Sequence, residues 1–71
     1  MTDVRAEITA NVWQVSVAVG DTVSEGDTLL ILESMKMEIP VEAPAAGRVR
    51  DLRVAPNDQV SEGDLLAVLE G

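Results

Sequence analysis

An internal repeat is the feature that most constrains how this chain can fold. Residues 17–33 read VAVGDTVSEGDTLLILE, and residues 54–70 read VAPNDQVSEGDLLAVLE, with eleven of seventeen aligned residues identical at an offset of 37. The same offset pairs Val4 with Val41 and Val12 with Val49. The chain therefore consists of two copies of one structural unit, each about half its length.

Each copy has the residue pattern of short β-strands. Residues 14–19 alternate polar or small residues with valine, the period of a half-buried strand. Turn dipeptides follow at 20–21 and 57–58, and apolar strands are expected at 28–32 and 65–69. Four glycines are predicted to be turn residues: Gly20, Gly26, Gly47 and Gly63. Short strands separated by such turns predict an all-β sandwich or barrel.

One segment has a competing interpretation. Residues 29–39, LLILESMKMEI, are rich in strong helix formers. However, Gly26 and Pro40 leave room for little more than three helical turns, and the repeat partner at 65–71 has a strand-like sequence. We therefore predict two strands joined by a hairpin turn at 34–37.

The repeat also predicts where the chain termini lie. If a two-fold axis relates the copies, the counterpart of the turn around Lys36 is the gap between Gly71 and Met1. Lys36 and the two termini should then lie at opposite ends of the domain.

The charge and composition exclude several classes of function. Thirteen acidic and five basic residues give a net charge of −8, which argues against binding nucleic acid or an anionic membrane surface. The absence of cysteine and histidine removes disulfides, thiolate metal sites and the commonest general base. The carboxylates alone form no convincing catalytic constellation and are interpreted as a solvated acidic surface.

Length and hydropathy predict one small soluble domain. We expect residues 1–71 to form a single domain with an aliphatic core, since Trp13 is the only aromatic residue. No apolar run approaches the length of a spanning helix, and nothing resembles a signal peptide, so a cytoplasmic location is expected. The chain begins with Met1 and contains no linker-like stretch, and its sequence is equally compatible with a free-standing protein and with a domain excised from a larger one.

Lys36 is the only lysine, and it lies where the hairpin turn is expected. Tight hairpin turns need positive φ and favour Asn-Gly or Asp-Gly, so Met35-Lys36 is a poor turn pair. A local rule broken at one place in an otherwise consistent sequence indicates a functional constraint. An exposed lysine is most often simply solvated, but methionines on both sides are typical of a surface recognised by another protein.

The segment Glu33-Ser34-Met35-Lys36-Met37-Glu38 resembles the biotin-attachment motif of biotinyl domains, usually written (E)AMKM. Residues 20–27 resemble the family's GDxVxxGD segment, and residues 43–49 its APxxGxV segment. The chain is thus similar over its whole length to the biotinyl-lipoyl attachment family, which includes biotin carboxyl carrier proteins. The resemblance implies a flattened barrel of two four-stranded antiparallel sheets with quasi-two-fold symmetry.

The resemblance also implies a function. Biotin would be attached covalently to Lys36 by a biotin protein ligase, with Met35 and Met37 as flanking recognition residues. Three further residues complete the motif: Glu33, Ser34 and Glu38. The attached biotin would carry a carboxyl group from a biotin carboxylase to a carboxyltransferase acting on an acyl-CoA or a keto acid. The chain would be a non-catalytic carrier, because the cofactor supplies the chemistry.

The chain departs from the family pattern in three places. Ser34 replaces the usual alanine, but a small residue is kept, so biotinylation is expected to survive. Residues 6–10, AEITA, stand where the first copy should repeat AP-x-x-G, which leaves the turn geometry there open. No insertion resembles the protruding thumb of some bacterial carrier proteins.

Two alternatives belong to other functional classes. A lipoyl domain has the same implied fold and a modified lysine at the same turn, but lipoyl sites generally lack the methionine pair. An unmodified interaction module would explain the fold and leave Met35-Lys36-Met37 unexplained.

Trp13 is expected to be half-exposed, with a partner contact as an alternative role. The arginines at 48, 50 and 53 are interpreted as solvated strand positions.

Overall fold

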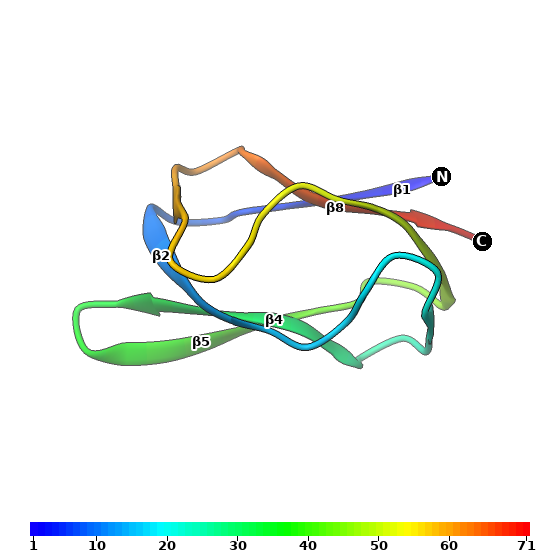
Figure 1. Cartoon of the computed structure of the whole chain (residues 1–71), viewed down its shortest axis with the longest axis horizontal. Coiled ribbons are helices and arrows are strands. Elements are labelled where there is room, and N and C mark those ends of the chain that lie inside the picture. The colour runs from blue at the N-terminus through cyan, green and yellow to red at the C-terminus, as the bar shows by residue number, and fades with distance from the viewer.

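The computed structural model of the protein describes residues 1–71 and contains eight β-strands and no helix (Figure 1). The strands are β1 (Thr2–Arg5), β2 (Ala10–Val15), β3 (Thr22–Val23), β4 (Thr28–Ser34), β5 (Met37–Glu42), β6 (Gly47–Leu52), β7 (Gln59–Val60) and β8 (Leu65–Glu70). They form two four-stranded sheets with the orders β1-β8-β6-β3 and β5-β4-β2-β7, and all pairs are antiparallel. The predicted all-β fold of two four-stranded sheets is confirmed.

The two copies of the repeat are related by a quasi-two-fold exchange. The N–H of Ala6 donates to the carbonyl of Asp64 at 2.9 Å, and the equivalent bond from Ala43 to Asp27 measures 2.8 Å. Because 6 and 43 differ by 37, as do 27 and 64, each copy supplies the partner that the other lacks. Each sheet accordingly combines strands from both copies.

The turns between strands share one construction. Four aspartate carboxylates each accept the backbone N–H of the residue three positions earlier, at 2.8–2.9 Å; they belong to Asp21, Asp27, Asp58 and Asp64. The residue before each aspartate has positive φ, between 78° and 98°. Three of these residues are glycine and the fourth is Asn57, and glycine and asparagine are the residue types that tolerate this conformation best. The repeated pair of a left-handed residue and an aspartate therefore specifies the turns.

Gly47 was predicted to be a turn residue, and this is wrong. It lies in β6 and its φ is not positive. Glycine is needed there for close approach, because a Cβ at this position would lie 2.8 Å from the carbonyl oxygen of Glu70.

The predicted strand over residues 14–19 is too long. Strand β2 ends at Val15, and Val19 is 60% exposed. The reason is local: the N–H of Ala18 donates to the carboxylate of Asp21 at 2.9 Å, and the N–H of Asp21 returns to the carbonyl of Ala18 at 3.0 Å. Side-chain capping of this kind competes with the sheet ladder and turns the chain away. The helical interpretation of residues 29–39 is also excluded, since they form β4, its turn and the start of β5.

The core lies between the two sheets and is entirely aliphatic. Fourteen residues are buried, all of them hydrophobic, and no buried side-chain polar atom lacks a partner. Both copies contribute matched residues: Leu29 and Leu66 are both 0% exposed, and Leu32 and Leu69 are both 1% exposed. The repeated sequence therefore builds one shared core rather than two separate ones.

The domain is elongated, measuring 33 × 17 × 17 Å. Strand β1 pairs with β8, with Thr2 opposite Leu69, so both termini lie together at one end. The turn between β4 and β5 lies at the opposite end (Figure 1). The predicted separation of Lys36 from the termini is thus confirmed.

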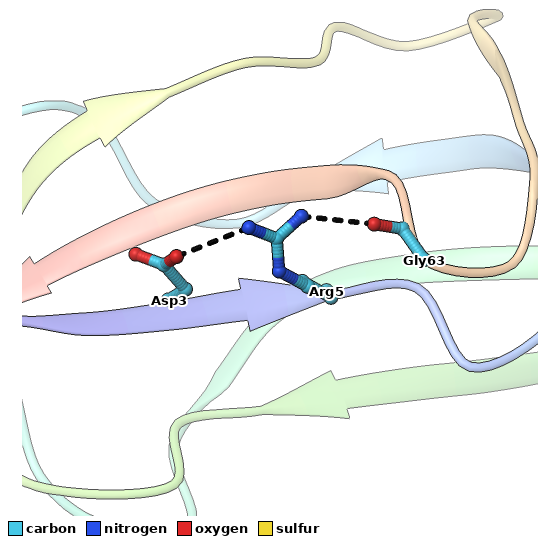
Figure 2. A network of polar contacts seen from close by, with 3 residues as sticks. All are labelled: Asp3, Arg5 and Gly63. Atoms are coloured by element: carbon cyan, nitrogen blue, oxygen red, sulfur yellow. Dashed lines mark hydrogen bonds and ion pairs between the residues drawn. The ribbon is translucent and has the colours of Figure 1, made fainter.

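Arg5 adds a side-chain contact to the pairing of β1 with β8. Figure 2 shows its guanidinium between the carboxylate of Asp3 and the carbonyl of Gly63, at 3.2 and 3.0 Å. The hydrogen bond to Gly63 connects the first strand to the turn that precedes β8.

Candidate functional site

The turn between β4 and β5 consists of two residues. In the β4–β5 ladder Ser34 pairs with Met37 and Glu33 with Glu38, which leaves only Met35 and Lys36 to reverse the chain. Both have positive φ, 52° for Met35 and 65° for Lys36. Left-handed conformation at both central residues is the geometry of a type I′ hairpin turn.

These two residues are a costly choice for such a turn. A non-glycine residue in the left-handed region costs on the order of 1 kcal/mol or more, and neither methionine nor lysine can offset it as asparagine does. The conformation is imposed by the six residue pairs of the β4–β5 ladder, which runs from Thr28 to Ser34. Met35 and Lys36 therefore occupy the turn despite their conformational preference, as expected where side-chain chemistry is required.

The side chains at this tip are open to solvent. Met35 is 91% exposed and Met37 is 63% exposed, and Lys36 is exposed between them. The Lys36 amine makes no ion pair and no hydrogen bond, even though two carboxylates of the hairpin lie within three residues of it in sequence. The tip thus presents a single unengaged primary amine between two exposed thioethers.

The structure brings all six motif residues together on this one hairpin. Glu33 and Glu38 are exposed and face each other across the strands, and Ser34 is half-buried below the turn. Glycine and proline are absent from the tip, so its shape depends on the two flanking strands.

A shallow notch lies beside the hairpin on the same sheet, and the sequence did not predict it. It has a volume of about 310 Å³ and is lined by Asn11, Val12, Trp13, Glu33 and Asn57. Asn11 of β2 pairs directly with Glu33 of β4, which places the notch three residues from Lys36. Trp13 lies at an irregularity of the β2–β4 ladder and is 47% exposed, which confirms the predicted half-exposure. Asn57 arrives from the turn before β7, a neighbour that no local pattern reveals.

Other parts of the surface offer less chemistry. A groove of about 470 Å³ runs between the edge strands β1 and β5, lined by aliphatic and charged side chains, and Val4 and its repeat partner Val41 both line it. No group of histidine, cysteine or carboxylate side chains is arranged to hold a metal ion. The structure contains no helix that is long and apolar enough to cross a membrane.

The fold and the hairpin together define a small two-fold β-domain that presents one lysine at its tip, away from its termini. The chain belongs to the biotin/lipoyl attachment family: the family model described as "Biotin-requiring enzyme" matches residues 1–69. The family resemblance seen in the sequence is thereby confirmed.

Curated relatives support this assignment. The chain is 62% identical over 47 residues to the biotinylated protein TB7.3 homolog of Mycobacterium leprae, and 68% identical over 41 residues to that of Mycolicibacterium smegmatis. These alignments cover 66% and 58% of each chain, less than two thirds of the relatives' lengths. The biotin/lipoyl attachment protein of Bacillus subtilis is 43% identical over 49 residues, which cover 69% of this chain and 67% of that protein.

Solved structures show the same fold as a small part of large carboxylases. The urea carboxylase of Kluyveromyces lactis superposes with a TM-score of 0.91 and 38% identity, over 97% of this chain and 6% of that one. A single-chain, multi-domain long-chain acyl-CoA carboxylase superposes with a TM-score of 0.87 and 33% identity, over 93% of this chain and 7% of that one. The chain therefore resembles a minor segment of each enzyme.

The tip fits a cofactor bound as an amide. Biotin carries a carboxylic acid on a flexible chain, and an amide to it needs an accessible primary amine that no other group holds. Lys36 is the only side chain of this kind, because the remaining basic residues are arginines.

Proposed function

We propose that residues 1–71 form a single biotinyl domain, with biotin attached through an amide to Lys36. The bound biotin carries a carboxyl group from a biotin carboxylase to a carboxyltransferase acting on an acyl-CoA or a keto acid. The chain is then a non-catalytic carrier and a substrate of a biotin protein ligase. The likeness to segments of urea and acyl-CoA carboxylases supports this role.

The observation that carries the proposal is the two-residue turn. Met35 and Lys36 both adopt the left-handed conformation that favours asparagine and glycine, and both are exposed. The fold accepts this cost at the one position that presents the only lysine. A purely structural turn would gain stability by replacing these residues.

Attachment requires help from the ligase. The Lys36 nitrogen attacks the carbonyl of biotinyl-adenylate, forms the amide bond and displaces AMP, and it loses a proton in the process. No carboxylate of the chain contacts the amine, so the ligase must supply the proton acceptor. Met35 and Met37 offer flexible apolar contacts to a recognising surface, and Glu33, Ser34 and Glu38 shape the hairpin beneath them.

The elongated shape suits a carrier. Lys36 and the termini lie at opposite ends of a domain 33 Å long, so the modified lysine points away from any neighbouring segment of chain. Tethering raises the local concentration of biotin at both partner sites, provided that the arm reaches them. The net charge of −8 limits non-specific adhesion, and no nucleic-acid or membrane partner is proposed. Because the proposed biotin carboxylase partner consumes ATP and bicarbonate, both present in the cytoplasm, we propose a cytoplasmic location.

Transfer of label tests the carrier role. The biotinylated chain is incubated with a biotin carboxylase, ATP and radiolabelled bicarbonate, and label on the protein is measured after rapid gel filtration. We expect label in proportion to the biotin content, and none on Lys36→Arg, which keeps the positive charge but cannot form the amide. Absence of label on fully biotinylated chain, while free biotin is carboxylated in the same mixture, contradicts the carrier role.

A further inference from the structure

The notch beside the hairpin has a composition that the attachment chemistry does not explain. Asn11, Trp13, Glu33 and Asn57 line it together with Val12, and none of the four polar or aromatic side chains makes an ion pair or hydrogen bond within the chain. An exposed indole surrounded by unengaged amide and carboxylate groups offers both a stacking surface and hydrogen-bonding partners.

The two-fold counterpart of the notch has different side chains. At an offset of 37, Asn11 and Trp13 correspond to Arg48 and Arg50, and Glu33 corresponds to Glu70. There both guanidinium groups lie 3.9 Å from the Glu70 carboxylate. The chain thus places two cationic side chains near this carboxylate at the terminal end, and at the lysine end it places none near the equivalent Glu33.

We propose that the notch is a resting site for the bicyclic ring of biotin attached to Lys36 of the same molecule, an inference that rests on the proposed function. The ureido group of biotin has two N–H donors and one carbonyl acceptor. Glu33 accepts, and the amides of Asn11 and Asn57 both donate and accept, so the side chains around the notch can satisfy all three ureido groups. Trp13 supplies the apolar surface for the fused rings.

The Lys36 side chain with its attached biotin is long enough for the ring to reach the notch. Glu33 precedes Lys36 by three residues, on the order of 10 Å along a strand. About eleven bonds separate the Lys36 Cα from the biotin ring, which extend to roughly 13 Å. Because the ring is tethered, its effective concentration at the notch is on the order of millimolar, so weak contacts suffice for substantial occupancy. The ring would leave the notch when a partner active site offers tighter binding.

Trp13 makes this site directly observable. It is the only tryptophan, and the chain contains no tyrosine or phenylalanine, so the intrinsic fluorescence reports on the notch alone. Three forms are compared by acrylamide quenching: unmodified chain, biotinylated chain and Lys36→Gln, which loses the charge as biotinylation does. We expect biotinylation to lower the quenching constant about twofold, with Lys36→Gln equal to the unmodified chain.

A pair of matched variants tests the hydrogen-bonding partners. Asn57→Gly keeps the positive φ, as its counterpart Gly20 shows, and removes one amide from the notch. In the biotinylated chain this variant should lose the protection of Trp13. The mirror-image change, Gly20→Asn, should keep it.

Equal quenching constants for the biotinylated chain and Lys36→Gln overturn the resting site, as does full protection in biotinylated Asn57→Gly. Failure of the proposed function is recognised separately, because the intact mass then shows no biotin on the chain before any fluorescence is measured.

Discussion

The two ends of this barrel occupy equivalent positions in the fold but differ in how the chain is connected and in most of their side chains. At one end β4 and β5 are joined by Met35-Lys36; at the other end the equivalent strands β8 and β1 carry the free termini. The matched aspartate turns and the matched core leucines are the same in both halves. Their identity shows which residues specify the fold, and it leaves the ends as the place where function is added.

The two sheets also differ in charge. The strands of the β1-β8-β6-β3 sheet contain three arginines and three carboxylates, whereas those of the β5-β4-β2-β7 sheet contain three carboxylates and no basic residue. Amide formation at Lys36 would remove the only positive side chain from the lysine end. The modified end is therefore expected to interact with basic partner surfaces, and more weakly at high salt.

Matched core truncations should affect the two halves equally. Leu32→Ala and Leu69→Ala each remove a buried side chain next to an end, and each should lower the free energy of unfolding by about 2–5 kcal/mol. Urea denaturation measures both, with Val19→Ala, at an exposed position, as the control that should change little. A difference of more than about 2 kcal/mol between the two leucine variants would show that the core is not shared evenly.

Substitution of Gly47 should destabilise the fold more than substitution of its repeat counterpart, Ala10. Gly47→Ala places a Cβ against the Glu70 carbonyl and should cost about 1–3 kcal/mol, because backbone must move. Ala10→Gly, the opposite change in the other half, should cost about 0.5–1 kcal/mol from added chain entropy. Equal and small losses in both variants would refute the close contact as the reason for this glycine.

Replacing Met35 should separate stability from recognition. Met35→Asn suits the left-handed conformation and should raise the free energy of unfolding by up to about 1 kcal/mol. The rate of biotinylation by a ligase should fall at the same time, because one flanking thioether is lost. Val19→Asn, at an exposed apolar residue outside the hairpin, is the control and should change neither quantity. An unchanged biotinylation rate for Met35→Asn would contradict the proposed role of Met35.

The contacts of Arg48 and Arg50 with Glu70 at the terminal end should contribute least to the free energy of unfolding. Arg50 and Glu70 are both about half exposed and their charged groups are 3.9 Å apart. A double-mutant cycle of Arg50→Ala and Glu70→Gln should give a coupling energy of about 0.5 kcal/mol or less. A coupling above about 1 kcal/mol would mean that the cluster stabilises the terminal end and is more than a solvated surface.

Much of this fold was predictable because it is written twice. The repeat identified two equivalent units, the turn dipeptides located most strand ends, and the misfit of Met35-Lys36 in a hairpin indicated the candidate site. The arginines at 48 and 50 are exposed strand residues as predicted, while Arg53 lies one residue beyond β6.

The errors arose where a pattern had two physical causes. Alternating valines over residues 14–19 suggested one strand. However, the carboxylate of Asp21 accepts a hydrogen bond from the N–H of Ala18, and the strand ends early. Gly47 looked like a turn glycine, and its absence of a side chain serves packing against Glu70 instead. The notch combines Trp13 with Asn57 from a distant turn, a neighbour that depends on the three-dimensional fold.

The most direct test of the account is the intact mass of the chain co-expressed with a biotin protein ligase, beside Lys36→Arg. We predict a mass increase of one biotinyl group on the unaltered chain and none on the variant. A lipoyl-sized increase would keep the attachment role and move the chemistry to acyl transfer. An unmodified chain, in cells where the ligase biotinylates another substrate, or a modification that persists in Lys36→Arg, would contradict the assignment of Lys36 as the biotin site.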